Sequence, residues 1–191
     1  MFTGIATNAG KIVEKSENKL RIQTEKSFIN KLSKGASVAV DGICLTVTNF
    51  SKDSFSVDYM PETKKRTNIQ YLKVGDLVNL ELPATLQTFL SGSIMQGHID
   101  SVSILKKIEQ KCNSKILTFS IPKNLGKYIV KKGTIAVNGI SLTVVDVKVG
   151  SFTVGIIPYT WEKTMLYTAR VGDYVNIEVD ILAKYIEKLV K

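Results

Sequence analysis

Short runs of alternating apolar and polar residues, bounded by turn residues, occupy most of the chain. They are rich in β-branched and aromatic side chains and end at Gly, Asp, Asn or Lys-Asp positions, which predicts β-strands. The predicted strands are residues 37–40, 45–50, 55–59 and 77–82, and later 134–137, 142–147, 152–157 and 174–179. Strands this short and this regularly spaced are expected of a small β-barrel or sandwich.

The strand pattern occurs twice, at an offset of 97 residues: residues 39–47, AVDGICLTV, return as residues 136–144, AVNGISLTV. The likeness continues without a gap to Glu81 and Glu178. A period this long, present in two copies, indicates two small domains and not a solenoid. We therefore expect a first domain over residues 1–88, a second over residues 89–180 and a terminal element over residues 181–191.

Helical periodicity is limited to three places. Two short helices are predicted at residues 27–32 and 123–130, one before the main strands of each copy. The third is C-terminal, where Ile181, Leu182, Tyr185, Ile186, Leu189 and Val190 follow one-face helical spacing. Such a helix either packs between subunits or caps its own domain.

Composition places the chain among ordinary globular proteins, with 44% apolar and 23% charged residues. The net charge of +9 comes from scattered lysines without interleaved aromatic residues, which favours a solvated surface over a nucleic-acid groove. Cys44 and Cys112 have no features that favour a disulfide. Without a signal-peptide pattern or an apolar stretch of membrane-spanning length, we expect a cytoplasmic protein with reduced thiols.

Candidate chemistry begins with the single histidine, His98. One histidine without Cys-x-x-Cys or His-x-x-x-His spacing does not predict a metal site. Gly97 precedes His98 and allows close approach of the backbone to a ligand, so a functional role is favoured over that of an ordinary surface or core histidine. Thr3, Gly4 and Ile5 occupy the corresponding place in the first copy.

The repeated Gly-Ile-(Cys/Ser)-Leu-Thr motif places two reactive side chains on one face of a strand. Cys44 and Thr46 in the first copy, and Ser141 and Thr143 in the second, stand two residues apart. These pairs either line the wall of a ligand pocket or are ordinary side chains of a half-buried strand. Because the pattern occurs beside a glycine in both copies, the pocket wall is favoured. The copies differ at Asp41/Asn138, Cys44/Ser141, Asp58/Gly155 and Glu62/Tyr159, which would let two related sites treat a ligand differently.

Together these features resemble the two-barrel riboflavin synthases over essentially the whole chain. The motifs that carry the resemblance are residues 1–5 (MFTGI), both GI(C/S)LTV repeats, 60–63 (MPET), 67–68 (TN), 97–100 (GHID), 157–160 (IPYT), and 176–180 (NIEVD) running into 183–185 (AKY). The resemblance implies an all-β fold of two tandem six-stranded antiparallel Greek-key barrels with a C-terminal helix that helps form a homotrimer.

The resemblance also implies an activity: dismutation of two 6,7-dimethyl-8-ribityllumazine molecules to riboflavin and 5-amino-6-ribitylamino-2,4-pyrimidinedione. No metal or organic cofactor is implied. Each active site is expected between the N-terminal barrel of one subunit and the C-terminal barrel of a neighbour. Association with lumazine synthase is a further possible partner interaction, whereas nucleic acid and membrane are not expected as partners.

Site residues follow from matching positions. The expected N-terminal pocket is lined by Gly4, Ile5, Ala6, Cys44, Leu45, Thr46, Asp58, Tyr59, Met60, Pro61, Glu62 and Thr63. The expected C-terminal pocket is lined by Gly97, His98, Ile99, Ser141, Leu142, Thr143, Gly155, Ile156, Ile157, Pro158, Tyr159 and Thr160, with Lys132 from across the interface. The expected catalytic residues are Ser141 and Thr143 for orientation, His98 and Asp180 for proton transfer, and Cys44 for activation.

Three positions depart from the family pattern. Asn138 stands where an aspartate is common, Ser93 where a histidine is common, and Tyr159 where a histidine or glutamate is usual. The missing carboxylate at Asn138 puts a base role next to Ser141 in doubt. The alternative function is that of a non-catalytic lumazine- or flavin-binding protein. An OB-like nucleic-acid-binding barrel, from a different class, rests only on charge and barrel shape.

Overall fold

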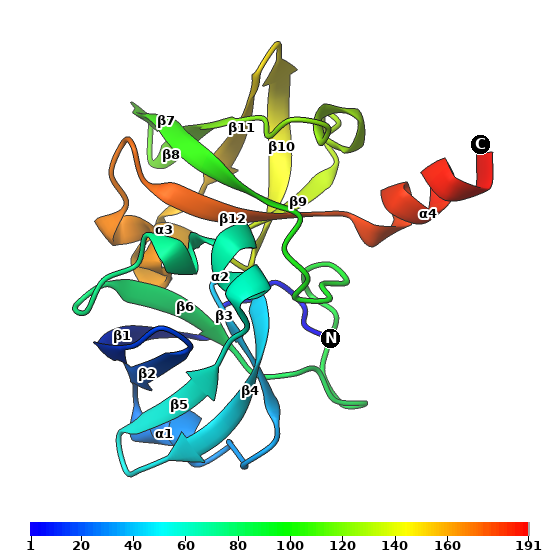
Figure 1. Cartoon of the computed structure of the whole chain (residues 1–191). Coiled ribbons are helices and arrows are strands. Elements are labelled where there is room, and N and C mark those ends of the chain that lie inside the picture. Colours follow the sequence, from blue (N-terminus) through cyan, green and yellow to red (C-terminus); the bar gives the residue numbers. More distant parts are fainter. Residues whose placement is uncertain (191) are drawn as a thin grey trace.

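Two closed six-stranded β-barrels, one above the other, form the body of the molecule (Figure 1). The computed structural model describes residues 1–190 of the 191. The first barrel has the strand order β1-β2-β5-β4-β3-β6 and the second β10-β11-β8-β7-β12-β9, with antiparallel pairs throughout. The predicted pair of tandem antiparallel barrels is therefore confirmed.

The strands of the first barrel are β1 (Asn8–Lys15), β2 (Lys19–Gln23), β3 (Ser37–Val40), β4 (Ile43–Phe50), β5 (Ser54–Asp58) and β6 (Leu77–Glu81). Those of the second barrel are β7 (Ser101–Lys111), β8 (Ser114–Ser120), β9 (Thr134–Val137), β10 (Ile140–Lys148), β11 (Ser151–Ile156) and β12 (Tyr174–Val179). All eight strands predicted from the periodicity are present, most within one or two residues. The opening hairpins β1-β2 and β7-β8 were not located from the sequence, because their charged residues obscure the alternation.

Apolar side chains fill each barrel completely. Phe28 and Phe55 belong to the core of the first barrel, with ring centroids 6.2 Å apart, and Phe119 and Phe152 belong to that of the second, with centroids 5.5 Å apart. Both cores are continuous clusters of buried aliphatic and aromatic residues. Because small barrels of this kind are solid inside, any ligand must bind on an outer face.

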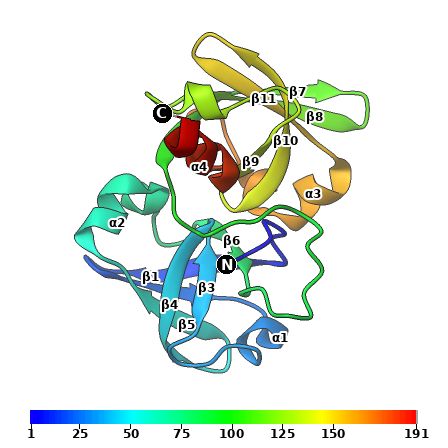
Figure 2. The same ribbon diagram turned by 90° about the vertical axis from the view of Figure 1, so that its right-hand side faces the viewer.

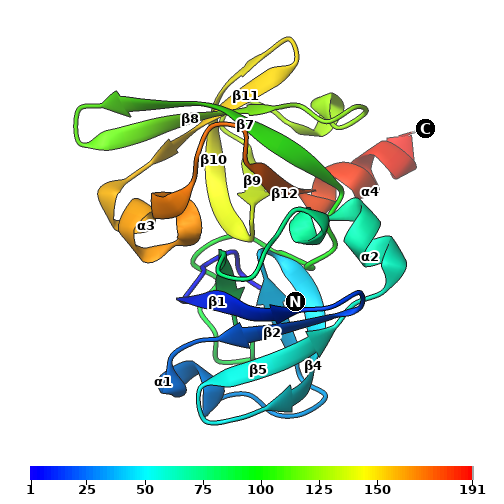
Figure 3. The same ribbon diagram turned by 60° about the vertical axis from the view of Figure 1, so that its left-hand side comes forward.

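Short helices close the connections between strands. They are α1 (Lys26–Ile29), α2 (Pro61–Arg66) and α3 (Pro158–Lys163), with 3-10 turns η1 (Asn68–Gln70), η2 (Gly126–Tyr128) and η3 (Met165–Thr168). The helix predicted at residues 123–130 is wrong: only the single turn η2 forms there. The pair α2 and α3, which the sequence did not reveal, lies on either side of the boundary between the barrels (Figure 3).

The C-terminal helix α4 (Ile181–Val190) is present as predicted and projects beyond the second barrel (Figure 1). Glu187 binds Lys127 and Tyr128, and Lys184 pairs with Asp100 at 2.6 Å. The opposite face stays exposed, with Leu189 84% and Ile186 61% accessible. None of the helices within residues 1–190 has the length and apolar character that a bilayer crossing requires.

The barrels meet where the two copies of one hairpin turn touch. Asp41 and Asn138 both have φ 45°, and the following Gly42 and Gly139 have φ 79° and 73°, as the tight turns between β3 and β4 and between β9 and β10 require. A Cβ at Gly42 would lie 2.7 Å from the Gly139 nitrogen, and one at Gly139 would lie 2.6 Å from the Gly42 nitrogen. Each turn therefore requires its glycine for two reasons: the positive φ angle and the close contact with the other turn.

A reciprocal set of buried hydrogen bonds surrounds these turns. The side-chain nitrogen of Asn79 donates to the Asn138 carbonyl at 2.9 Å, and that of Asn176 donates to the Asp41 carbonyl at 2.9 Å. Within each barrel, the Asn79 N–H donates to the Asp41 carboxylate and the Asn176 N–H to the Asn138 side chain. Each of these four bonds has a counterpart in the other copy, so the two barrels are related by an approximate twofold axis.

Two differences between the copies, Asp41/Asn138 and Asn68/Met165, break this symmetry. The Asp41 carboxylate accepts from the Asn68 side chain at 2.8 Å, whereas the matching Asn138 donates to the Met165 sulfur at 3.6 Å. Asn138 is therefore buried at the barrel boundary, and a carboxylate there would not face a ligand as a base. Desolvation raises the pKa of Asp41 to about 7, although the hydrogen bonds from Asn79 and Asn68 oppose the shift.

We predict that Gly139→Ala destabilises the protein far more than Gly150→Ala. Gly150 has the same kind of backbone, φ 75°, but a Cβ there would meet nothing within 4 Å. The control substitution should therefore cost about 1 kcal/mol of backbone strain, and the turn substitution about 3 kcal/mol because the contact is also overpacked. Denaturant unfolding measures both; equal losses would contradict the assigned contact.

We also predict that Asp41→Asn removes a pH-dependent loss of stability. Because the folded pKa, about 7, lies above the ordinary value of 3.8, the native state holds the proton more tightly. The stabilisation is complete below about pH 4 and is lost as the pH rises towards 7. Over this pH window the free energy of unfolding of wild type should fall relative to that of the variant, by at most about 1.4 kcal/mol per pH unit. Above about pH 7 the difference between the two proteins should stay constant. Parallel curves from urea titrations would contradict the prediction.

Candidate functional site

The outer faces of β4 and β10 carry the predicted reactive side chains. Along β4, Leu45 and Val47 are buried, whereas Cys44 and Thr46 alternate with them and face outwards. Ser141 and Thr143 take the same positions on β10. The prediction that each pair shares one strand face is confirmed, and both pairs lie outside the filled barrels.

Several residues expected to line the pockets point away from them. Leu45, Leu142 and Ile156 belong to the barrel cores, with exposures of 5%, 8% and 1%. Tyr59 is buried as well, and its hydroxyl donates to the Ser16 carbonyl at 2.6 Å. These four positions can offer a ligand only backbone atoms, because strand alternation turns their side chains inwards.

The Gly4 segment, residues 3–6, crosses to the second barrel. The Ser141 N–H donates to the Gly4 carbonyl at 2.8 Å, and a Cβ on Gly4 would lie 2.7 Å from the Ser141 Cβ. Ala6 packs against the second core. In Figure 2 the N-terminus lies between the two barrels.

The Gly97 segment, residues 96–99, makes the opposite crossing. The Cys44 N–H donates to the Gly97 carbonyl at 2.9 Å, a Cβ on Gly97 would lie 2.6 Å from the Cys44 Cβ, and Ile99 packs against the first core. The expected grouping of Gly4, Ile5 and Ala6 with Cys44, and of Gly97, His98 and Ile99 with Ser141, is therefore wrong. Sequence order suggested that each segment serves the barrel it precedes, but the fold exchanges them.

Two buried glutamates hold the exchanged segments. Glu81 accepts from the Thr3 N–H and hydroxyl, both at 2.7 Å, and from the Gly4 N–H at 3.0 Å. Glu178 accepts from the Gln96 N–H at 2.8 Å and the Gly97 N–H at 3.1 Å. Desolvation raises the pKa of both carboxyls, against the effect of these hydrogen bonds.

The glutamates were not identified as site residues from the sequence. The available signal was a charged residue kept in both copies on a mostly apolar strand, at the matching positions Glu81 and Glu178. A buried charge is retained only where it is satisfied. Here backbone N–H groups of the crossing segments satisfy it.

The linker adds a further side chain to the Ser141 surface. The Ser93 and Ser141 hydroxyl oxygens lie 2.5 Å apart, and the Ser93 N–H donates to the Thr3 carbonyl at 2.8 Å. Ser93 belongs to residues 82–100, which join the barrels and form an isolated β-bridge between Met95 and Phe2. Ser93 therefore couples Ser141, through its hydroxyl, to the Gly4 segment, through its backbone N–H.

The other walls of the two surfaces are also equivalent. Thr46 pairs with Asp58 across β4 and β5, and the chain continues into the exposed start of α2 through Met60, Pro61, Glu62 and Thr63. In the second copy, Gly155 is followed by Ile157, Pro158, Tyr159 and Thr160 at the start of α3. Met60 and Tyr159 are 67% and 69% exposed, so each surface is rimmed by large uncovered side chains.

Three remaining predicted residues lie at the margins. His98 is exposed and follows Gly97 on the Cys44 side. Lys132 is exposed at a turn with φ 65°, its N–H bonded to the Val144 carbonyl. Asp180 accepts from the Leu182 N–H at 2.9 Å and so starts α4. No acidic, cysteine or histidine cluster suited to a metal ion occurs within residues 1–190.

Two hollows of the chain lie apart from the Cys44 and Ser141 strand faces. One, of about 460 Å³, lies beside α1 and includes Ile5 from the Gly4 segment. The other, of about 880 Å³, follows the barrel boundary near the stacked rings of Tyr71 and Tyr174. In the single chain Thr46 and Thr143 are exposed, whereas Cys44 and Ser141 are half-buried beside the glycine segments.

Sequence comparison agrees with this arrangement. The lumazine binding domain model matches residues 3–83 and again 96–180, once for each barrel. The riboflavin synthase of Actinobacillus pleuropneumoniae is 40% identical over 98% of this chain and 89% of that protein. The chain belongs to the riboflavin synthase family. The family's enzymes from Bacillus subtilis and Schizosaccharomyces pombe are each 37% identical, over 97% and 100% of this chain and 87% and 94% of theirs.

Solved structures of the protein LumP share the riboflavin synthase fold seen here. LumP complexed with riboflavin matches with a TM-score of 0.88 and 27% identity, over 94% of this chain and 99% of that one. LumP complexed with 6,7-dimethyl-8-(1'-D-ribityl) lumazine matches with a TM-score of 0.84 over the same shares. Both bound molecules are ring systems that carry a ribityl chain.

Proposed function

We propose that this riboflavin synthase family member is a transferase that dismutates two molecules of 6,7-dimethyl-8-ribityllumazine. One molecule gives a four-carbon unit to the other, which yields riboflavin and 5-amino-6-ribitylamino-2,4-pyrimidinedione. The observation that supports this most is the presence of two equivalent strand faces, each completed by a glycine segment from the other half of the chain. A reaction between two identical molecules needs two such related sites.

The exposed rims of the two surfaces support an active site shared between subunits. Each carries large exposed side chains, Met60 in the first copy and Tyr159 in the second, which a neighbouring chain would cover. Since the two barrels differ, contact between the first barrel of one chain and the second barrel of the next is head-to-tail, and such contacts form a ring when the rotation between neighbours closes. We propose a homotrimer, with the exposed face of α4 in its interface. A cytoplasmic location and an association with lumazine synthase are part of the same proposal.

Positioning accounts for much of the rate in this scheme. Two ring systems held face to face react as one unit, and good orientation alone supplies on the order of 7 to 11 kcal/mol. The C7 methyl of the lumazine is a carbon acid because its anion delocalises into the ring. The chain's tasks are therefore to align the rings, move protons and stabilise the charge that develops.

The proposed residue roles follow the geometry. Ser141 and Thr143 present hydroxyls to one ring, with the Ser93 hydroxyl 2.5 Å from that of Ser141 to orient it. Cys44 and His98 serve the other ring, since the Gly97 segment brings His98 to the Cys44 side. Asp180 is proposed for proton transfer beside α4.

A non-catalytic lumazine-binding protein is the second candidate, because LumP shares the fold. The curated relatives that match over nearly the full chain carry the name riboflavin synthase at 36–40% identity, against 27% for LumP. Retention of reactive side chains on both strand faces also supports the enzyme.

Incubation of the purified full chain with 6,7-dimethyl-8-ribityllumazine should produce riboflavin, followed by its absorbance and green-yellow fluorescence. The pyrimidinedione should appear in equal amount, because the reaction consumes two lumazines for each riboflavin. A stable lumazine complex without product would reject catalysis and favour the binding protein.

Ser141→Ala and His98→Ala should each lower turnover at least about 100-fold, the usual contribution of a group that moves or orients a proton. Lumazine affinity should change little, because the glycine segments and strand faces remain. Ser33→Ala, at an exposed loop serine, is the matched control and should leave both quantities unchanged. Unaltered turnover in the Ser141 and His98 variants would refute their roles.

A further inference from the structure

The two buried glutamates act on parts of the chain that serve the opposite barrel. Glu81 lies on β6 of the first barrel and is 7% exposed, and Glu178 lies on β12 of the second and is 4% exposed. Each carboxylate uses both oxygens to accept hydrogen bonds from backbone N–H groups of its segment. Such charge-assisted bonds are short and strong.

The far side of each segment contacts a reactive strand of the other barrel. Gly4 bonds Glu81 through its N–H, while its carbonyl accepts from Ser141 of β10. Gly97 bonds Glu178 through its N–H, while its carbonyl accepts from Cys44 of β4. A single glycine residue therefore links each carboxylate to the site strand, so a shift of the segment at the carboxylate is expected to move its contact with that strand.

We propose that Glu81 and Glu178 are positioning residues that act crosswise. Glu81, in the first barrel, sets the Ser141 surface of the second barrel, and Glu178, in the second barrel, sets the Cys44 surface of the first. The effect on catalysis rests on the proposed function, whereas the crosswise control of the two surfaces does not.

Substitution of each glutamate by glutamine tests the proposal best, because glutamine has the same side-chain shape as glutamate but only one acceptor oxygen. Its amide nitrogen would face a backbone N–H, so one hydrogen bond is lost and two donors oppose each other. Loss of a bond to a charged acceptor corresponds to about a tenfold shift or more in the equilibrium that keeps the segment in place.

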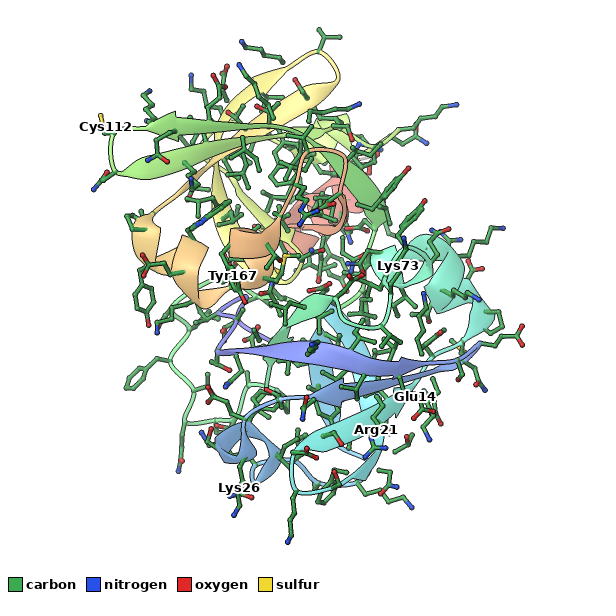
Figure 4. All side chains as sticks on the ribbon, turned by 90° about the vertical axis from the view of Figure 1, so that its left-hand side faces the viewer. Glu14, Arg21, Lys26, Lys73, Cys112 and Tyr167 are labelled. Carbon is green, nitrogen blue, oxygen red and sulfur yellow. The ribbon has the colours of Figure 1, made fainter. Side chains whose placement is uncertain are left out.

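The half-buried Cys44, whose N–H and Cβ face the Gly97 segment, serves as a reporter of the position of that segment. The other cysteine, Cys112, is exposed on the β7-β8 hairpin of the second barrel (Figure 4) and is first removed as Cys112→Ser. In that background, Glu178→Gln should speed modification of Cys44 by an aromatic disulfide reagent about tenfold or more. Glu81→Gln should leave the rate near that of the parent.

A second reporter cysteine, at position 141, is expected to respond to the other glutamate. With Cys44→Ser and Ser141→Cys added to the same background, the only thiol lies under the Gly4 segment. Now Glu81→Gln should speed its modification about tenfold or more, and Glu178→Gln should not. Each glutamate is thus the matched control for the other, on full-length protein and without any substrate.

Acceleration of the thiol in the same barrel as the altered glutamate, of both thiols equally, or of neither would overturn the proposal. Circular dichroism melting checks that the variants are folded at the assay temperature. If a glutamine variant does not fold, Glu178→Asp and Glu81→Asp repeat the test with a shorter carboxylate, and the same crosswise pattern is required. Riboflavin formation by wild type is measured separately, so failure of the proposed function would leave the thiol result intact.

Discussion

The close contact between the Asp41-Gly42 and Asn138-Gly139 turns is the constraint on which the arrangement depends. The turn backbones approach so closely that a Cβ on either glycine would clash with the other turn, and Asn79 and Asn176 each donate across the boundary to the opposite turn. Buried polar groups must be satisfied, and here each half of the chain satisfies the other. This fixes the approximate twofold axis.

The glycine segments can cross only because of that axis. With the barrels held turn to turn, β4 and β10 lie close enough for Gly97 to reach Cys44 and for Gly4 to reach Ser141. A chain with the same barrels in another orientation would keep both cores but lose both site surfaces. The contact between domains is therefore part of the site and not only a source of stability.

The duplication keeps the scaffold while it varies the chemistry. Strand order, turn angles and the two glutamates are repeated, yet Cys44 stands opposite Ser141 and Asp58 opposite Gly155. Solid barrel interiors leave the outer faces as the place where such changes are tolerated, since a core position allows little change of volume. Two like ligands would thus meet similar surfaces with different reactive groups.

The sequence by itself determined the duplication, the eight main strands and the C-terminal helix. It also determined that Cys44 and Thr46 share one strand face, as do Ser141 and Thr143. All of these features follow from local periodicity and from the repeat. Which segment serves which barrel was decided only in three dimensions. Gly4 precedes the first barrel along the chain but completes the second, and Asn138, three residues from Ser141, is buried at the boundary. Local pattern carries no information on how two separately closed barrels are docked, and contacts between residues far apart in the sequence settle it.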